Sequence, residues 1–172
     1  MDLVILPEIE KALFPLRDDE FVALENSALT EGIRDALVVW PRDGQLILVD
    51  GHHRYKLAKK HNLPFKVQEK RFANTEEVLL WIDANQLGRR NLTDEQRLLV
   101  LGRMYERQKK AATGFADRDI SGGQNVHREK TAEKIASLAG VGEKTVRRAA
   151  EFAKAVDAGS SLKKLLILAG FS

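Results

Sequence analysis

The segment QLILVDGHHRYKLAKKH, residues 45–61, determines the fold of the N-terminal half of this 172-residue chain. Its first part, 45–50, consists mainly of Leu, Ile and Val, which predicts a strand covered on both faces. Gly51 follows at once, and the apolar spacing within 52–61 predicts a helix that ends before Pro64. The segment therefore predicts a strand, a tight turn and a helix in direct succession.

The sequence on either side of this segment extends the pattern into a small α/β domain. Pro41-Arg42-Asp43-Gly44 is typical of a hairpin turn, and Thr93 with Gln96 fits a capping box that begins a helix. We expect a helix over 19–30 capped by Gly32, a strand over 36–40 paired through the turn 41–44, a strand over 65–72, a helix from Asn74 or Thr75 through Ile82, and a helix over 93–112.

Composition excludes several classes of protein. The chain has no cysteine, so disulfides, thiolate zinc sites and cysteine nucleophiles are excluded, while 44% hydrophobic residues can supply a core. No apolar run is long enough to span a bilayer, and the first residues lack the features of a signal peptide. We therefore expect a soluble cytoplasmic protein without a membrane partner.

The charge is divided unevenly between the two ends of the chain. Residues 1–102 contain 14 Lys and Arg against 17 Asp and Glu, a net charge of −3. The remaining residues contain 14 against 8, a net charge of +6. A basic C-terminal part suits a partner with phosphate groups, such as nucleic acid, although a solvated basic surface would give the same count.

Residues 131–156, TAEKIASLAGVGEKTVRRAAEFAKAV, have the spacing of a helix-turn-helix. Ala136 is small where two helices would cross, Gly140 lies where the turn needs a positive φ, and Val146 can anchor the second helix. The stretch 113–129 before it lacks periodicity and is expected to be a linker. The rest of the expected apolar seam is Ile135, Leu138, Val141 and Ala149.

In a helix-turn-helix the second helix enters the major groove of DNA. Here that helix would begin near Gly142 and present polar side chains outward, and the sequence leaves open whether its arginines contact bases or phosphates. One such motif has a small footprint, so we expect a homodimer or a second anchoring surface. The candidate DNA-binding residues are Lys144, Thr145, Arg147 and Arg148, with Glu143 beside them.

The turn between the predicted strand and helix is a candidate phosphate site. A glycine at this position leaves free N–H groups at the positive end of a helix, where an anion can approach closely. Gly51 is followed by His52, His53 and Arg54, which can donate hydrogen bonds to phosphate oxygens. The alternative is a glycine required only by the turn and an arginine paired with a surface acid.

Two motifs resemble the nucleotide motifs of ParB-type N-terminal domains. They are LVDGHHRYKLA, residues 48–58, and NQLGRRNLTDEQR, residues 85–97, and a helix-turn-helix follows them in the order of that family. The resemblance is to the ParB-like proteins of plasmids, phages and mobile elements. It implies an α/β plus all-α fold, with a ParB/sulfiredoxin-like nucleotide-binding domain over 1–92 and a helical DNA-binding domain over 93–172.

The resemblance also implies roles for individual residues. Gly51 and Arg54 match the glycine and the phosphate-contacting arginine of the first motif, and Ala58 its small packing residue. Asn85, Gln86 and Arg89 match residues of the second motif that hold the triphosphate and metal. The ligand implied is CTP, or another nucleotide, with Mg²⁺; no metal site is expected from a cluster of side chains.

At the first motif the chain differs from partition ParB and from sulfiredoxin, which shares the fold. Partition ParB has glutamate and arginine where this chain has His52 and His53, so hydrolysis is not implied and a weak NTPase activity is left open. Sulfiredoxin has its reactive cysteine at the place of His52. Because this chain has no cysteine, sulfiredoxin chemistry is excluded.

The sequence leaves three functions to be compared. The first is a ParB-type DNA-binding protein of plasmid or chromosome partition or mobile-element maintenance, associated with nucleoid or plasmid DNA and regulated by a nucleotide. The second is a phosphoryl-transfer enzyme or nuclease, with Asp50 or Glu31 as catalytic candidates. The third is a helix-turn-helix transcriptional regulator that needs no ligand.

Overall fold

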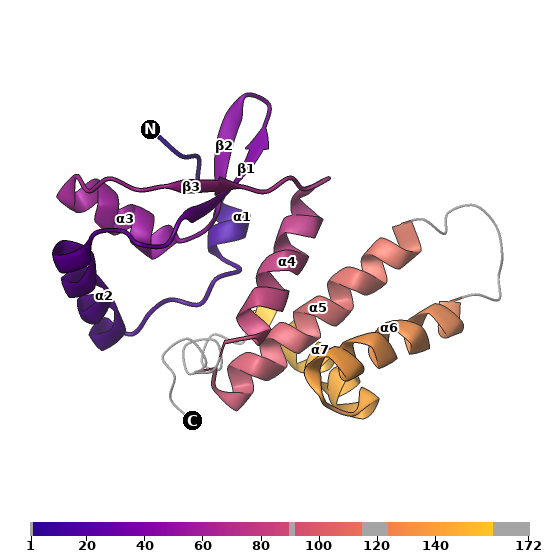
Figure 1. Ribbon diagram of the computed structural model, residues 1–172. Coiled ribbons are helices and arrows are strands. Elements are labelled where there is room, and N and C mark those ends of the chain that lie inside the picture. Colours follow the sequence, from indigo (N-terminus) through magenta and orange to yellow (C-terminus); the bar gives the residue numbers. More distant parts are fainter. Residues whose placement is uncertain (1, 90–91, 115–123, 160–172) are drawn as a thin grey trace. The chain divides into compact units, whose positions relative to one another are not determined.

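A computed structural model describes residues 2–89, 92–114 and 124–159 of the chain, and side chains except those of 112–130 within these ranges. The chain divides into two compact units, residues 1–82 and 83–172 (Figure 1). The functional boundary expected after residue 92 stays a prediction. The described elements are α1 (Pro7–Glu10), α2 (Asp18–Glu31), β1 (Leu37–Arg42), β2 (Gln45–Asp50), α3 (His52–His61), β3 (Val67–Glu69), α4 (Thr75–Leu87), α5 (Asp94–Gly114), α6 (Gln124–Ala139) and α7 (Glu143–Asp157).

The hairpin of β1 and β2 forms as the turn chemistry predicts. Asp43 and Gly44 have φ values of 51° and 76°, and Arg42 is paired with Gln45 across the turn. Positive φ at both central residues is the geometry that favours Asp-Gly in a two-residue hairpin. The predicted hairpin is therefore confirmed, but β1 continues through Pro41 and Arg42, so the turn consists of Asp43 and Gly44 and not of residues 41–44.

The described sheet has three strands in the order β2-β1-β3, with β1 antiparallel to β2 and parallel to β3. Val4 adds a bridge on the other side of β2, where its N–H donates to the Leu46 carbonyl over 2.9 Å. Strand β1 is therefore central. Its residues Leu37 and Val39 are fully buried, as are Leu48 and Val49 of β2.

Apolar side chains cover both faces of the sheet. On one face Trp40, Ile47 and Val49 pack with residues of α1 and α4. On the other face Leu37, Val39 and Leu48 pack with Tyr55 of α3. The near-continuous apolar composition of the two strands is explained by this double burial.

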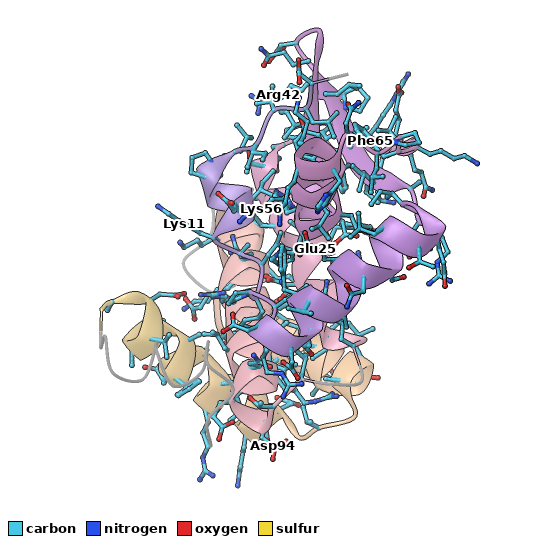
Figure 2. All side chains as sticks on the ribbon, turned by 90° about the vertical axis from the view of Figure 1, so that its left-hand side faces the viewer. Lys11, Glu25, Arg42, Lys56, Phe65 and Asp94 are labelled. Atoms are coloured by element: carbon cyan, nitrogen blue, oxygen red, sulfur yellow. The ribbon has the colours of Figure 1, made fainter. Side chains whose placement is uncertain are left out.

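Helix α3 is also held by α2. Glu25 of α2, labelled in Figure 2, accepts hydrogen bonds from Lys60 Nζ at 2.7 Å and from His61 Nε2 at 2.5 Å. These contacts lower the pKa of the Glu25 carboxyl. The helix whose N-terminus carries the candidate phosphate site is thus fixed from both the sheet and α2.

The second unit contains a three-helix arrangement of α5, α6 and α7. Helix α5 begins with the predicted capping box, in which the Thr93 N–H donates to Gln96 Oε1 at 3.1 Å and the Gln96 N–H donates to Thr93 Oγ1 at 3.2 Å. Helix α7 buries a stripe of small and β-branched residues at helical spacing. These are Val146, Ala149, Ala150, Ala153 and Val156.

Three sequence expectations about elements were wrong in part. The strand expected over 65–72 is paired only over Val67–Glu69, because Phe72 packs edge-on against the rings of Trp40 and Trp81 instead of continuing the sheet. Helix α4 continues beyond Ile82 to Leu87. Part of the expected linker is helical, since α6 begins at Gln124, where the chain contains neither Gly nor Pro until Gly140.

The predicted seam between α6 and α7 is also corrected at one position. Ile135, Ala136, Val146 and Ala149 are buried, but Leu138 is 66% exposed. Ile135 and Ala136 already occupy the inner positions of this last stretch of α6, which leaves Leu138 on its outer face. In the described part of the chain no helix combines the length and apolar character needed to cross a bilayer.

Candidate functional site

Gly51 forms the N-cap of α3 in a conformation that other residues rarely adopt. Its φ is 94°, and a Cβ atom built there would lie 2.5 Å from Leu37 Cδ2 and 3.2 Å from Arg54 Nη2. No side chain caps the helix, and its first turn contains no acidic residue. Because Gly51 has no side chain, Leu37 of β1 and the Arg54 guanidinium can lie close to the backbone at the positive end of α3.

The Arg54 guanidinium already has acceptors in this structure. Its Nη2 donates to Asp50 Oδ2 at 2.9 Å, and its Nη1 donates to the carbonyls of Asp35 at 3.1 Å and Ala36 at 3.4 Å. The side chain is only 20% exposed. Arg54 therefore ties α3 to the end of β2 and to the segment before β1, and an incoming anion would share or displace these acceptors.

The imidazole ring of His52 makes no hydrogen bond with the described residues. Both of its ring nitrogens are buried, and neither has a hydrogen-bond partner among the described residues. Burial lowers the pKa of His52, and the neighbouring carboxylates of Glu10 and Asp50 only partly oppose this effect. A neutral imidazole offers one donor and one acceptor, so the site holds unused capacity for hydrogen bonding.

Two other predicted residues lie in different surroundings. His53 faces α2, where its ring packs edge-on against Phe21 with centroids 6.1 Å apart. Glu31 is the last residue of α2 and pairs with Arg34 Nη1 at 2.6 Å. Glu31 thus lies at the end of α2 and is paired with a nearby arginine.

The residues of the second motif lie in the second unit. Asn85 and Gln86 are neighbours on α4, but Asn85 is exposed whereas Gln86 is 1% exposed. Arg89 follows the helix and is exposed, and its N–H donates to the Gln86 carbonyl at 2.9 Å. Within this unit, the motif therefore presents Asn85 and Arg89 to solvent and uses Gln86 in the interior.

Helix α7 carries the candidate DNA-binding residues opposite its buried stripe. Lys144, Arg147 and Arg148 are exposed, and Thr145 is half-buried. Arg147 Nη2 pairs with Glu143 Oε2 of the preceding turn at 3.2 Å. Gly140, with φ 66°, occupies the turn between α6 and α7 as the spacing predicted. The use of this helix pair to bind DNA stays a prediction.

A buried ion pair in the second unit was not predicted from the sequence. Asp83 of α4 has a side chain 1% exposed, and its Oδ2 accepts a hydrogen bond from Arg107 Nε of α5 at 3.0 Å. Burial raises the pKa of Asp83 to about 6, although Arg107 and Arg103 oppose the shift. The available signal was a single acid directly after the apolar run 78–82.

The described residues test the fit of a nucleotide and of a metal separately. The N-terminus of α3 has chemistry suited to a phosphate group, because the ring nitrogens of His52 have no hydrogen-bond partner among the described residues and the first helical turn contains no acid. For a metal, the part of the chain that the structure describes brings no three His, Asp or Glu side chains together. Asp50 is the carboxylate beside the turn, and Arg54 binds one of its oxygens.

Comparison with known proteins identifies the fold. No protein-family model matches the chain, and no curated protein matches it in sequence. The structure of a pNOB8-like ParB N-domain aligns with a TM-score of 0.61 and 16% identity over 97% of this chain and 69% of that chain. A second structure of the pNOB8-like ParB N-domain aligns with a TM-score of 0.59 and 19% identity over 97% and 65%.

A third structure has a lower TM-score. The C-terminally truncated chromosome-partitioning protein ParB from Caulobacter crescentus, complexed with CTP-gamma-S, aligns at 0.44 with 17% identity over 98% of this chain and 81% of that chain. The two higher scores show that the chain has a ParB-like fold. They confirm the fold expected for the N-terminal part of the sequence.

Proposed function

We propose that this chain, which has the fold of the ParB N-domain, is a DNA-binding protein of the ParB type whose DNA binding is regulated by a nucleotide. Its setting would be plasmid or chromosome partition or mobile-element maintenance, in the cytoplasm on nucleoid or plasmid DNA. The observation that carries the proposal is α7, which buries one stripe of Ala and Val and exposes Lys144, Arg147 and Arg148. A homodimer would supply the second half of the footprint.

The nucleotide part of the proposal rests on the N-terminus of α3. There the helix presents its N–H groups without a capping side chain, and Gly51 allows close approach. His52 would bind the ligand through a ring nitrogen, and Arg54 would contribute a charge-assisted bond. Mg²⁺ enters the proposal as the counter-ion of the nucleotide, because such ions take most ligands from phosphate and water.

Replacing Arg54 by alanine is expected to weaken nucleotide binding by roughly tenfold to a hundredfold, because one charge-assisted hydrogen bond contributes about 1.5–3 kcal/mol. The measurement is calorimetric titration with CTP, ATP, GTP and ADP in the presence of magnesium. Arg42→Ala is the matched control, since Arg42 is an exposed arginine of the same unit that stacks on Trp40 at the hairpin.

Two results would contradict this assignment. One is unchanged affinity in Arg54→Ala, and the other is an equal loss in Arg42→Ala. Because Arg54 also holds the segment before β1, a thermal melt of each variant checks that the first unit remains folded. Absence of binding by the wild-type protein to every nucleotide would reduce the α/β unit to a scaffold and favour a plain regulator.

Replacing Arg148 by alanine is expected to weaken DNA binding about tenfold or more while leaving nucleotide affinity unchanged. Arg148 is chosen because Arg147 is partly neutralised by Glu143. The measurement is fluorescence anisotropy on duplexes that the wild-type protein selects from a random pool. If Arg148 contacts a phosphate, the dependence of log affinity on log salt also falls by about 1; a base contact leaves it near the wild-type slope.

The control for this variant lies on the same helix. Lys154→Ala removes a cation two turns beyond Arg147, and that lysine already pairs with Glu106 at 3.4 Å and Glu151 at 3.2 Å. Its DNA affinity should stay within about twofold of wild type, as is usual for a cation away from the interface. If Lys154→Ala lost as much DNA affinity as Arg148→Ala, the loss would be a general effect of charge. Helix α7 would then no longer be the proposed DNA-contacting helix.

A further inference from the structure

Four charged side chains of the second unit form a group that crosses three helices. Asp83 of α4 pairs with Arg107 of α5, and Arg103 of α5 pairs with Asp157 at the end of α7. The Arg103 guanidinium binds both carboxylate oxygens of Asp157, through Nη2 at 2.7 Å and Nε at 3.3 Å. We call Asp83, Arg103, Arg107 and Asp157 the charge cluster.

The members of the charge cluster act on one another across the two pairs. The charge of Arg103 lowers the pKa of Asp83, and the charge of Asp157 raises it. Asp83 is the buried end, with a second oxygen, Oδ1, that has no hydrogen-bond partner among the described residues. Asp157 is the half-exposed end, with 48% of its side chain in solvent. A change at one end is therefore felt electrostatically at the other.

The charge cluster connects the two helices of this unit that carry predicted functional residues, α4 and α7. Asp83 precedes Asn85 and Gln86 of the second nucleotide motif on the same helix. Asp157 is the last residue of α7, the helix that carries Arg148. Between them, α5 contacts α7 at Gly102, where a Cβ would lie 2.1 Å from the Ala149 carbonyl oxygen. A shift of the end of α4 therefore has a direct route through Arg107 to the α5 and α7 pair.

We infer that Asp83 is a positioning residue, which through Arg107 and the charge cluster couples ligand binding at the end of α4 to the arrangement of α7. The inference rests on the proposed function, since it names how nucleotide binding through Asn85 and Arg89 of the second motif would be coupled to α7. Asp83 touches neither ligand in this account. Its carboxylate binds Arg107 and so fixes α5 relative to the end of α4. Because α7 packs against α5, the same ion pair affects the position of α7.

The test is a complete linkage cycle on the full chain. The affinity for CTP with magnesium is measured with and without DNA, and the affinity for DNA with and without CTP, for wild type, Asp83→Asn and the control Glu151→Gln. Glu151 is an exposed carboxylate of α7, and its ion pair with Lys154 lies within the same helix. Coupling factors between sites are usually about 5 to 150.

We expect wild type and Glu151→Gln to share one coupling factor in that range. In Asp83→Asn each ligand alone should bind within about threefold of wild type, while the coupling factor falls towards one. An Asp83→Asn protein that keeps the wild-type factor would overturn the inference. Asp157→Asn is the second variant if Asp83→Asn does not fold, because it changes the half-exposed end of the charge cluster and leaves the core intact. The coupling factor of Asp157→Asn should also fall.

A pH series separates positioning from a purely structural role. Lowering the pH through about 6 protonates Asp83 and weakens its hold on Arg107, so the coupling factor of the wild type should fall, whereas that of Asp83→Asn should not change. Arg103, Arg107 and Asp157 are the charged groups that face Asp83. A wild-type factor independent of pH in this window would contradict the role given to the carboxylate.

The inference can fail separately from the proposed function. If wild type binds no nucleotide, the proposed function fails, and amide hydrogen exchange without ligands decides the inference. Asp83→Asn should then raise exchange about tenfold across residues 149–157 of α7, and Glu151→Gln should leave it unchanged. Unaltered exchange in α7 would restrict the Asp83 and Arg107 pair to a local role and overturn the coupling.

Discussion

Replacing Gly102 by alanine is expected to destabilise the helical unit by about 3 kcal/mol, at the upper end of what overpacking a helix contact costs. The Cβ would lie 2.1 Å from the carbonyl oxygen of Ala149, 2.6 Å from its carbonyl carbon and 2.7 Å from Ala153 Cβ. These are backbone atoms and a short side chain, so α5 and α7 must separate. Alanine favours a helix over glycine by only about 1 kcal/mol, which does not offset this cost.

Urea denaturation followed by far-UV circular dichroism measures this effect. The matched control is Gly88→Ala, because Gly88 is exposed, lies outside the left-handed region, and would place its Cβ no closer than 3.5 Å to a neighbouring atom. Its unfolding free energy should stay within about 0.5 kcal/mol of wild type, as for other surface substitutions. A Gly102→Ala protein as stable as wild type would mean that α5 and α7 do not approach this closely.

The free energy of unfolding of wild type minus that of Asp83→Asn is expected to rise by about 3 kcal/mol when Asp83 becomes protonated. This magnitude follows because one pKa unit corresponds to about 1.4 kcal/mol. The pKa of Asp83 is about 6 in the folded chain against 3.8 as its ordinary value, so the folded chain binds this proton more tightly. The stabilisation is therefore fully present below about 3.8 and is lost as the pH rises through about 6.

This prediction is tested by the difference in unfolding free energy between wild type and Asp83→Asn from pH 7.5 to about pH 3. The difference removes the effect of other carboxyls, such as Asp2 and Glu25, whose lowered pKa values act in the opposite direction. It should shift in favour of wild type as the pH falls. A shift in favour of Asp83→Asn would mean that the charge of Arg107, and not burial, dominates at Asp83.

The two Asp83 experiments give opposite trends on acidification. Stability attributed to Asp83 rises because a buried charge is removed, whereas coupling between the ligand sites falls because the carboxylate releases Arg107. A residue with only a structural role would change the first quantity and not the second. The pair of measurements therefore distinguishes a costly buried charge from one that positions a neighbouring helix.

The sequence by itself determined those features that depend on neighbouring residues. Asp43-Gly44 specified the hairpin because both residues tolerate positive φ, and Thr93 with Gln96 specified the start of α5 because their side chains reach the first free N–H groups. Gly51 between an apolar strand and a helix specified the turn of the candidate phosphate site. Each signal lies within a few residues and needs no distant partner.

Only the tertiary structure decided which partners lie far apart in the sequence. Residue types name Arg54 as a phosphate ligand, but not its bonds to the Asp35 and Ala36 carbonyls. The residues next to Gly102 do not show that Ala149 packs against it, and those next to Asp83 do not show that Arg107 binds it in the interior. Side-chain burial and long-range pairing arise only when separate helices pack, and local sequence patterns do not encode that geometry.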